Sequence, residues 1–406
     1  MTGYAITDEM LLQYKKELQQ ELGAILSFWQ EYATDHEFGG FYGRMDNSNH
    51  VFNNAPKGAV LNARILWAFS AAYNLTANES YLESATRAFE YFINYFIDGK
   101  NGGVYWTIDY QGFPLDTRKQ IYALSFAVYG LSEYYLAAKS EEAKQAAIRM
   151  YDAIVMHSYD LTNGGYIEAL SADWKPLHDL RLSEKDANEK KSMNTHLHVL
   201  EGFANLYRSW ADEVLKKRIA GLIHIFFEHI IDPETHHLKL FFDEEWHSKS
   251  RIISYGHDIE AAWLILEAVE IIGDPVLMNQ AKIAAIQMAN AAAEGLDTDG
   301  GLWYEYNSDS KHWIREKHSW PQAESMIGFF NAWQITGQEK YLQISLDSWT
   351  FIQKFILDKA NGEWFWGITQ NYSIMNEDKV GLWKCPYHNS RACIELIKRI
   401  HLLKND

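Results

Sequence analysis

Cysteine and proline are scarce in this 406-residue sequence, and their scarcity excludes some classes of protein. The two cysteines, Cys385 and Cys393, are too few for a disulfide framework or a thiolate metal site. We therefore expect two reduced thiols, on one helix or on the loop that leads into it. Only seven prolines interrupt the chain, which is typical of a protein that is mostly helical.

Long apolar runs and an excess of basic residues are also missing. No run is long enough to cross a bilayer, and the first residues lack the basic and apolar regions of a secretory signal. The formal net charge is -17 without any basic cluster, which argues against binding to nucleic acid or to an anionic membrane. We therefore expect a cytoplasmic protein with neither of these partners, acting on a neutral rather than an anionic small molecule.

Aromatic residues, in contrast, are abundant, with 15 tryptophans and 24 tyrosines. Most of these rings are expected in a hydrophobic core. Aromatic faces are also the surfaces on which neutral sugar rings stack, so a minority is expected to line a binding cleft.

A glycine-containing turn recurs along the chain at a nearly constant interval. Its first glycine is Gly39, Gly102, Gly164, Gly300 and Gly362 in turn, which gives intervals of 63, 62, 136 and 62 residues. A degenerate copy at Thr235-His236-His237 divides the long interval. The chain therefore contains six units of roughly 63 residues, each with a short β-like run after its turn.

Two helical patterns alternate between the turns. One has a single apolar stripe, as in residues 79–98, whereas the other is apolar nearly all round, as in residues 60–72 and 261–266. We predict an all-α protein, a single (α/α)6-barrel domain over residues 1–406 with buried inner helices and short β-hairpin turns at one end. An open superhelix is the alternative. The polar, irregular segment 171–191 is expected to form a mobile loop over the mouth.

Residues 251–263 join a loop to an inner helix and place a histidine at its start. The loop is expected to end at Gly256, and Glu260 follows His257 by three residues, so the two side chains are neighbours on the helix surface. A carboxylate in that position would orient the imidazole and set which nitrogen carries the proton, as in a general base. The alternative is a polar first turn that only hydrogen-bonds the backbone.

A similar arrangement recurs in all six units, because each inner helix carries a few distinctive residues near its start. These are Arg64; Tyr122; Asn194 and His198; His257 and Glu260; Trp320 and Glu324; and His388 and Arg391. We expect all of them at one level around one end of the barrel, where they form a shared site. Six separately satisfied core positions are the alternative. His196, two residues from His198, points elsewhere and is interpreted as structural.

Three kinds of chemistry are candidates for such a set of residues: metal binding, glycoside hydrolysis and proton transfer. The three histidines would suit zinc, but Arg64 at the same level would repel a cation, so we expect no metal. A glycosidase needs two suitably spaced carboxylates, and each of Glu260 and Glu324 has a neighbour that explains it otherwise. Histidines that face one substrate favour proton transfer. The glycine turns lack the spacing of a phosphate-binding loop.

Three motifs in this set resemble one enzyme family. Asn194-Thr-His-Leu-His198-Val-Leu-Glu201, Tyr255-Gly-His257-Asp-Ile-Glu260 and Pro386-Tyr-His388-Asn-Ser-Arg391 are similar to motifs of the cellobiose 2-epimerases, in the N-acylglucosamine 2-epimerase superfamily. The resemblance extends over essentially the whole chain, and the three motifs together are specific. It implies epimerisation at C2 of the reducing-end glucose of β-1,4-linked disaccharides, such as cellobiose or lactose, to mannose.

The resemblance also implies a role for each residue. His257 and His388 are the acid/base pair, and His198 and Arg64 contact the developing enediolate oxygen. The other candidates bind hydroxyls, orient rings or pack on the sugars: Tyr122, Asn194, Glu260, Trp320, Glu324, Trp383 and Arg391. Imidazole is a weak base for a carbon-bound proton, so the enediolate must be stabilised as it forms. One histidine must also move a proton to open the sugar ring, and the sequence does not assign that step.

We therefore expect an enzyme that needs no cofactor and acts as a monomer on a small oligosaccharide. Two alternatives remain. One is a monosaccharide epimerase or aldose–ketose isomerase of the same superfamily, acting on mannose or N-acylglucosamine. The other is a non-catalytic sugar-binding barrel, which would bind sugar tightly without turnover.

Overall fold

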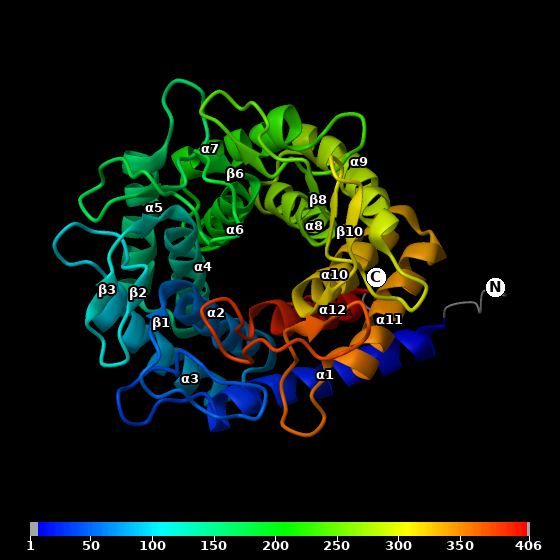
Figure 1. The fold of residues 1–406 in the computed structure, drawn as a ribbon, viewed down its shortest axis with the longest axis horizontal. Helices are drawn as coiled ribbons and strands as arrows, with labels where there is room; N and C mark the ends of the chain where they lie inside the picture. Colours follow the sequence, from blue (N-terminus) through cyan, green and yellow to red (C-terminus); the bar gives the residue numbers. More distant parts are fainter. Residues whose placement is uncertain (1–6, 404–406) are drawn as a thin grey trace.

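The computed structural model describes residues 7–403 of the chain, which form two concentric rings of helices (Figure 1). The inner ring is built from α2 (Ala59–Thr76), α4 (Ile121–Ala138), α6 (Met193–Ser209), α8 (Tyr255–Ile272), α10 (Ser319–Thr336) and α12 (Tyr387–Leu402). The outer ring is built from α1 (Asp8–Glu31), α3 (Glu79–Tyr91), α5 (Glu141–Ser158), α7 (Glu213–Ile225), α9 (Pro275–Ala292) and α11 (Glu339–Phe351). The predicted (α/α)6 barrel is confirmed.

The ring is closed by helices from the two ends of the described chain. Each inner helix packs on the next, and α12 packs on both α10 and α2. Five helix pairs follow one another in sequence, whereas the sixth pair joins α12 to α1, the first helix (Figure 1). The open superhelix is therefore wrong, because its first and last inner helices would not be neighbours.

Burial explains the two helical patterns. Residues 59–72 of α2 and residues 121–134 of α4 are buried without interruption. Outer helix α3 buries only one side, through residues such as Ala85 and Phe89. Burial of a large apolar side chain contributes about 1.5–3 kcal/mol, so the inner helices are stable only inside the ring. Three outer helices continue into π-helical turns that the sequence pattern does not predict: Phe92–Phe96, Phe226–Ile230 and Ile352–Ile356.

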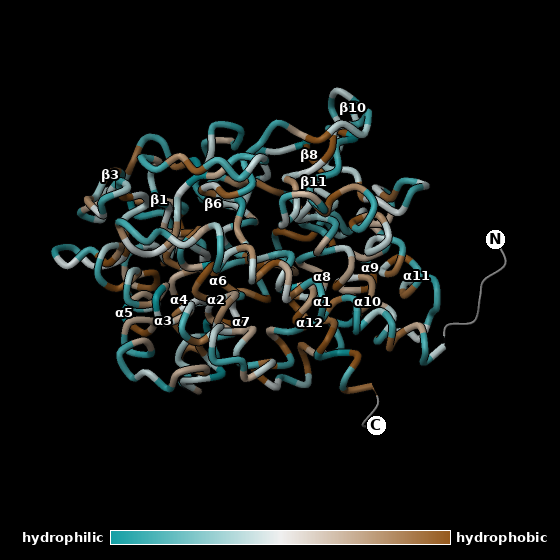
Figure 2. The backbone as a smooth tube through the Cα atoms, turned by 90° about the horizontal axis from the view of Figure 1, so that it is seen from below, coloured by the Kyte–Doolittle hydropathy of each residue, from teal (hydrophilic) through white to brown (hydrophobic). Residues whose placement is uncertain are grey.

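Short antiparallel strands collect at the end of the barrel where the inner helices begin (Figure 2). Five strands lead directly into an inner helix: β1 (Lys57–Gly58), β4 (Lys119–Gln120), β6 (Lys191–Ser192), β8 (Ile252–Ser254) and β11 (Lys317–His318). Their partners come from the following unit: β2 (Thr107–Ile108), β5 (Ala169–Leu170), β7 (Phe241–Phe242), β9 (Glu305–Asn307) and β12 (Gly367–Ile368). Two outer strands, β3 (Pro114–Asp116) and β10 (His312–Ile314), extend two of these sheets. The predicted hairpins at one end are confirmed.

A buried lysine that pairs with an aspartate supports the turn in five of the six units, a feature that the predicted pattern did not include. The pairs lie at 2.7–2.9 Å: Lys57–Asp35, Lys119–Asp98, Lys191–Asp160, Lys317–Asp297 and Lys379–Asp358. In the fourth unit Ile253 takes the place of the lysine, and His237 of the degenerate turn pairs with Asp258 at 2.7 Å. The fourth unit therefore lacks both the glycine turn and the lysine that supports it in the other units.

Segment 171–190 is the irregular connection between β5 and β6 at the strand end of the barrel. Its centre is anchored, because Nε2 of Gln120 donates to the carbonyls of Leu180 and Arg181 at 3.3 and 3.0 Å. Asn188 accepts a hydrogen bond from the Leu180 backbone at 2.9 Å. The irregular course agrees with the prediction, and the mobility of the segment stays a prediction.

Two predictions for the chain as a whole can be compared with the structure. Cys385, just before α12, and Cys393, on α12, are both free and buried, as expected. Within residues 7–403, no helix is both long enough and apolar enough to cross a membrane.

Candidate active site

The predicted site residues lie near the starts of the inner helices, on two tiers. The second or third residues of their helices are Tyr122, Asn194, His257, Trp320 and His388. The fifth or sixth residues are Arg64, His198, Glu260, Glu324 and Arg391. Three or four residues along an α-helix correspond to about 5 Å. The prediction of one level is therefore wrong, and the deeper tier holds His198 together with the arginines and glutamates.

His257 is held by a serine and not by the predicted glutamate. Helix α8 already includes Gly256 in its first turn, so the preceding loop ends earlier than expected. Nδ1 of His257 lies 2.8 Å from Oγ of Ser254, the last residue of β8. The predicted Glu260–His257 pair is wrong, because Glu260 accepts a hydrogen bond from Arg391 of α12 instead.

His388 has the kind of carboxylate partner that the sequence predicts for His257. Its Nδ1 lies 2.7 Å from Oε1 of Glu324. Arg391 donates to the same oxygen at 2.6 Å, and Nε1 of Trp263 donates to the other oxygen at 3.0 Å. A carboxylate surrounded by three donors is suited to its ionised form, which can only accept. Glu324 therefore accepts the Nδ1 proton of His388 and leaves Nε2 as the basic nitrogen.

Arg391 connects three inner helices beneath the histidines. It is fully buried and donates to Glu201 on α6, Glu260 on α8 and Glu324 on α10. Tyr387 donates to the two oxygens of Glu201 at 2.6 and 2.7 Å. The planar guanidinium, with five N–H donors, can serve several carboxylates at once. The geometry thus gives Arg391 a positioning role and does not favour its predicted contact with substrate, nor that of the two buried glutamates, Glu260 and Glu324.

A second cluster joins α2, α4 and α6. Nδ1 of His198 lies 2.8 Å from Glu201, and the His198 ring meets the Tyr122 ring edge-on with 5.0 Å between centroids. Arg64 donates to the hydroxyl of Tyr122 at 2.7 Å and lies over the ring of Phe126 at 4.1 Å. The predicted residues Arg64, Tyr122 and His198 are therefore immediate neighbours.

The indole of Trp320 contacts both candidate acid/base residues. Its centroid lies 4.7 Å from that of the His257 ring and 5.5 Å from that of the His388 ring. On the other side of the site, Trp383 lies 5.9 Å from the ring of Tyr122 and 5.7 Å from that of Trp106. The structure thus brings the two histidines to one aromatic surface, and a second aromatic group stands beside Tyr122.

Three buried polar atoms of the predicted site residues have no protein hydrogen-bond partner, namely Nε of Arg64, Oδ1 of Asn194 and Nε of Arg391. Buried polar atoms are nearly always hydrogen bonded, so such atoms are suited to receive a ligand. His196 differs, because its Nε2 accepts from the Tyr166 backbone at 2.9 Å and its Nδ1 lies 2.7 Å from the Ser192 carbonyl. The structural interpretation of His196 is confirmed.

Burial favours the neutral form of all three site histidines. It lowers the pKa of His257 to about 3. It also lowers the pKa of His198, and that of His388 falls well below its ordinary value, with Arg64 adding to the effect. Neutral imidazoles can accept a proton at physiological pH, so these three side chains are suited to proton transfer.

The three buried glutamates differ in their titration. Burial, and then the charge of Glu324, raises the pKa of Glu260 to about 8. Burial also opposes ionisation of Glu201, but Arg391 and His198 outweigh it and lower the pKa of Glu201 to about 2. Burial raises the pKa of Glu324, against the opposing effects of Arg391 and Trp263. Burial therefore opposes the ionisation of Glu260 and Glu324, whereas Arg391 and His198 favour the ionised form of Glu201.

One group in the described part of the chain has the spacing of a metal site. Glu260, Glu324 and His388 offer ligand atoms that all lie within 4.8 Å of one another. Nη2 of Arg391 lies 2.6 Å from an oxygen of each of these two carboxylates. The guanidinium therefore already provides the positive charge that a metal ion would bring, and the donor set fits an ion-pair network better than a metal site.

Four side chains that the structure places in the site are absent from the predicted set: Glu201, Ser254, Trp263 and Tyr387. Two of them lie next to a predicted histidine. Ser254 contacts His257, and Tyr387 contacts Glu201 and lies beside His388, with 4.6 Å between ring centroids. A local signal exists for both, because Ser254 precedes His257 by three residues and Tyr387 is adjacent to His388.

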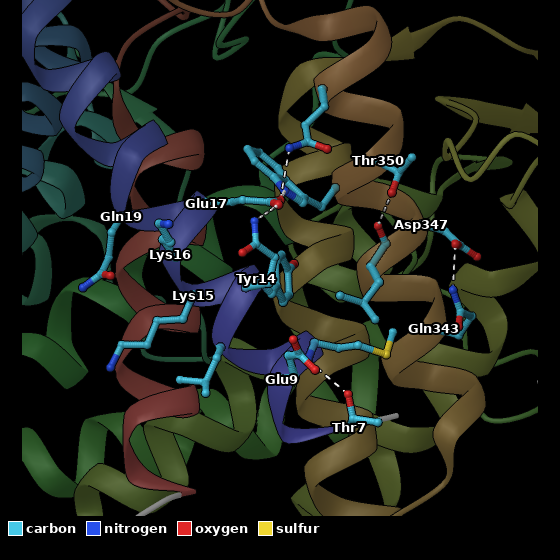
Figure 3. A pocket seen from close by; sticks show the side chains of 16 residues that line it. Thr7, Glu9, Tyr14, Lys15, Lys16, Glu17, Gln19, Gln343, Asp347 and Thr350 are labelled. Carbon is cyan, nitrogen blue, oxygen red and sulfur yellow. Dashed lines mark hydrogen bonds between the residues drawn. The ribbon is translucent and has the colours of Figure 1, made fainter. Parts of the chain in front are cut away.

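A groove on the outside of the barrel is separate from this site. It has a volume of about 950 Å³ and runs between the first half of α1 and α11 (Figure 3). Glu17 accepts hydrogen bonds there from Trp349 and Gln353, at 2.8 and 3.2 Å. None of the residues that line the groove belongs to the predicted set.

Comparison with known proteins connects this geometry to a family. A family model described as N-acylglucosamine 2-epimerase matches residues 40–392. A cellobiose 2-epimerase of Bacteroides fragilis is 49% identical over 392 residues, covering 96% of this chain and 99% of that protein. The solved structure of a cellobiose 2-epimerase from Bacillus thermoamylovorans B4167 has a TM-score of 0.92 at 38% identity, covering 95% of this chain and 99% of that one.

More distant similarity reaches other sugar isomerases. A D-mannose isomerase of Marinomonas mediterranea is 23% identical over 405 residues, covering 96% of this chain and 98% of that protein. The sequence identity of this chain with the cellobiose 2-epimerase of Bacteroides fragilis is thus about twice its identity with this isomerase.

Proposed function

Because the chain belongs to the N-acylglucosamine 2-epimerase family, we propose that it is a cellobiose 2-epimerase. It inverts C2 of the reducing-end glucose of cellobiose, lactose and similar β-1,4-linked disaccharides, giving the mannose epimer. The observation that carries the proposal is the contact of His257 and His388 with the same indole, that of Trp320. An inversion by proton transfer requires one imidazole that accepts the C2 proton and a second imidazole that donates a proton to the opposite face.

In the proposed reaction the sugar ring first opens to the aldehyde. One histidine removes the proton from C2, and the electron pair of the broken C–H bond moves toward the carbonyl oxygen to give an enediolate. The second histidine, which carries a proton, delivers it to the opposite face of C2. The electron pair of the enediolate forms the new C–H bond. At the end of the reaction the first histidine is protonated and the second is neutral.

Arg64 and His198 stabilise the enediolate oxygen in this mechanism. Arg64 is a permanent cation whose Nε has no protein partner, and a donor aimed at a developing oxyanion lowers the barrier most in a water-excluded site. His198 is kept in a single orientation by Glu201 at 2.8 Å. This geometry supports an oxyanion-binding role for both residues.

The remaining contacts suit a neutral disaccharide. Asn194, whose Oδ1 has no protein partner, and Tyr122 bind sugar hydroxyls, and Trp320 and Trp383 pack on the sugar rings. Glu260, Glu324 and Arg391 act one layer behind and orient the groups that meet the sugar. We propose a monomeric enzyme without a cofactor.

The decisive assay is incubation with cellobiose followed by analysis of the sugars formed. The glucosyl-mannose disaccharide is expected, and in heavy water it carries deuterium at C2. Mannose and N-acetylmannosamine are tested side by side, because the similarity to the D-mannose isomerase makes a monosaccharide substrate the second candidate. Faster turnover of either monosaccharide would replace the disaccharide proposal, and binding of cellobiose without turnover would indicate a non-catalytic barrel.

The roles of His257 and His388 are tested by replacing each with alanine. Each variant is expected to fold normally and to lose epimerase activity, by roughly 100-fold or more if a general acid or base is removed. His224→Ala is the matched control, because His224 lies on outer helix α7 with a side chain that is 55% exposed. Near-normal turnover by either site variant would contradict its assigned role.

A further inference from the structure

The contact between Ser254 and His257 sets one histidine of the site apart from the other two. Nδ1 of His198 and Nδ1 of His388 each face a glutamate, at 2.8 and 2.7 Å. Nδ1 of His257 faces only the hydroxyl of Ser254, at 2.8 Å. Ser254 is buried, with 1% of its surface exposed, at the junction of β8 and α8.

Ser192 occupies the equivalent position before α6, and its hydroxyl makes a different contact. Ser192 is the residue just before α6, and its Oγ accepts a hydrogen bond from the Thr195 backbone at 3.1 Å. That contact is the usual N-terminal cap of a helix, for which serine is among the preferred residues. Ser254 has a similar extended backbone before α8, yet its side chain caps nothing and contacts the imidazole instead.

The chemical difference between the two kinds of partner affects basicity. A carboxylate that accepts an Nδ1 proton favours the cationic ring, because an opposite charge next to it stabilises the imidazolium. A hydroxyl accepts the same proton and fixes the ring orientation, but it adds no charge. The proton on the imidazolium of His257 is therefore held less tightly than it would be beside a glutamate.

We propose that Ser254 is a positioning residue that holds the Nδ1 proton of His257 without a negative charge and so makes His257 the readier proton donor to carbon. The inference rests on the proposed epimerase function. In the donating step the N–H bond at Nε2 breaks and the C–H bond at C2 forms from the electron pair of the enediolate. The Nδ1 proton stays on the ring and remains bonded to Oγ of Ser254. In the reverse direction the same atoms take the proton back.

Burial agrees with this assignment, because it lowers the pKa of His257 and no carboxylate is bonded to the ring to counter it. Two titratable groups nearby also act on the pKa of His257. His198 lowers the pKa of His257 further, and Glu324 opposes the shift from α10. A negative charge introduced at position 254 would therefore act directly on a ring that is otherwise kept neutral.

The experiment compares Ser254→Ala, Ser254→Thr and the control Ser192→Ala. Ser254→Ala is expected to lower kcat roughly 10- to 100-fold with little change in KM, because a hydrogen bond to a ring that becomes charged is lost. Ser254→Thr keeps a hydroxyl and is expected to recover most of the activity. Ser192→Ala removes a cap, so it is expected to lower the melting temperature while kcat stays unchanged.

A spectroscopic readout separates positioning from general structure. With ¹⁵N-labelled histidine, the wild-type His257 is expected to carry its proton on Nδ1, and Ser254→Ala is expected to populate both neutral tautomers. This readout needs no turnover, so it tests the positioning even if cellobiose is not epimerised. The proposal is overturned if the wild-type ring is protonated on Nε2, if Ser254→Ala retains its kcat, or if threonine and alanine lose activity equally.

Discussion

Replacing Glu324 with glutamine would remove the negative charge beneath His388 while keeping the shape of the side chain. The carboxylate accepts three hydrogen bonds, from Nδ1 of His388, Nη2 of Arg391 and Nε1 of Trp263. A glutamine offers one acceptor oxygen and an NH₂ group that can only donate. At least one of the three donors would then face another donor in a fully buried place.

The magnitude follows from the loss of a charge-assisted hydrogen bond. Such a bond contributes about 1.5–3 kcal/mol, which corresponds to a decrease in kcat of roughly 10- to 150-fold. KM is expected to change little, because Glu324 is buried and does not meet the sugar. An unsatisfied buried donor also costs about 1–3 kcal/mol of the free energy of unfolding.

The assay measures kcat and KM for cellobiose together with urea-induced unfolding. Glu168→Gln is the matched control, because Glu168 is also buried but accepts from two hydroxyls, those of Ser192 and Thr195, which can turn to suit an amide. This control is expected to keep its kcat. A folded Glu324→Gln enzyme with the kcat of the wild type would refute the role given to the Glu324–His388 pair.

Three further results are expected. The pKa of Glu260 is raised from 4.5 to about 8, so the folded chain binds more protons than the unfolded chain between these values, and stability should fall as pH rises through that window. Glu260→Gln should remove this slope, measured as urea midpoints at pH 5 and pH 8, and an unchanged slope would contradict the assignment. Because burial lowers the pKa of His257 to about 3, kcat/KM should be retained at pH values below about 6.5, the ordinary pKa of histidine. A loss of activity centred near pH 6.5 would show that a site histidine titrates normally. Dialysis against EDTA should leave activity intact, because Arg391 already neutralises the carboxylates near His388, whereas inactivation that a divalent metal ion reverses would identify a metal site.

Local sequence patterns were sufficient to predict the repeat of inner and outer helices. Burial of single segments accounts for the helices that are apolar nearly all round, such as residues 60–72, and for the striped helices, such as residues 79–98. The helical repeat also identifies which side chains lie near the start of each inner helix. For these reasons the sequence alone predicted the six helix pairs and the set of residues near the starts of the inner helices.

The partners within the site were decided only by the tertiary structure. Glu201 and Arg391 lie 190 residues apart, and Glu324 and His388 lie 64 apart, yet each pair is in contact because α6, α10 and α12 all belong to the inner ring. The sequence paired Glu260 with His257, its neighbour on the same helix, whereas in the structure Glu260 accepts a hydrogen bond from Arg391 of α12. Closure of the ring by α1 and α12 depends in the same way on contacts between distant segments, which no local pattern encodes.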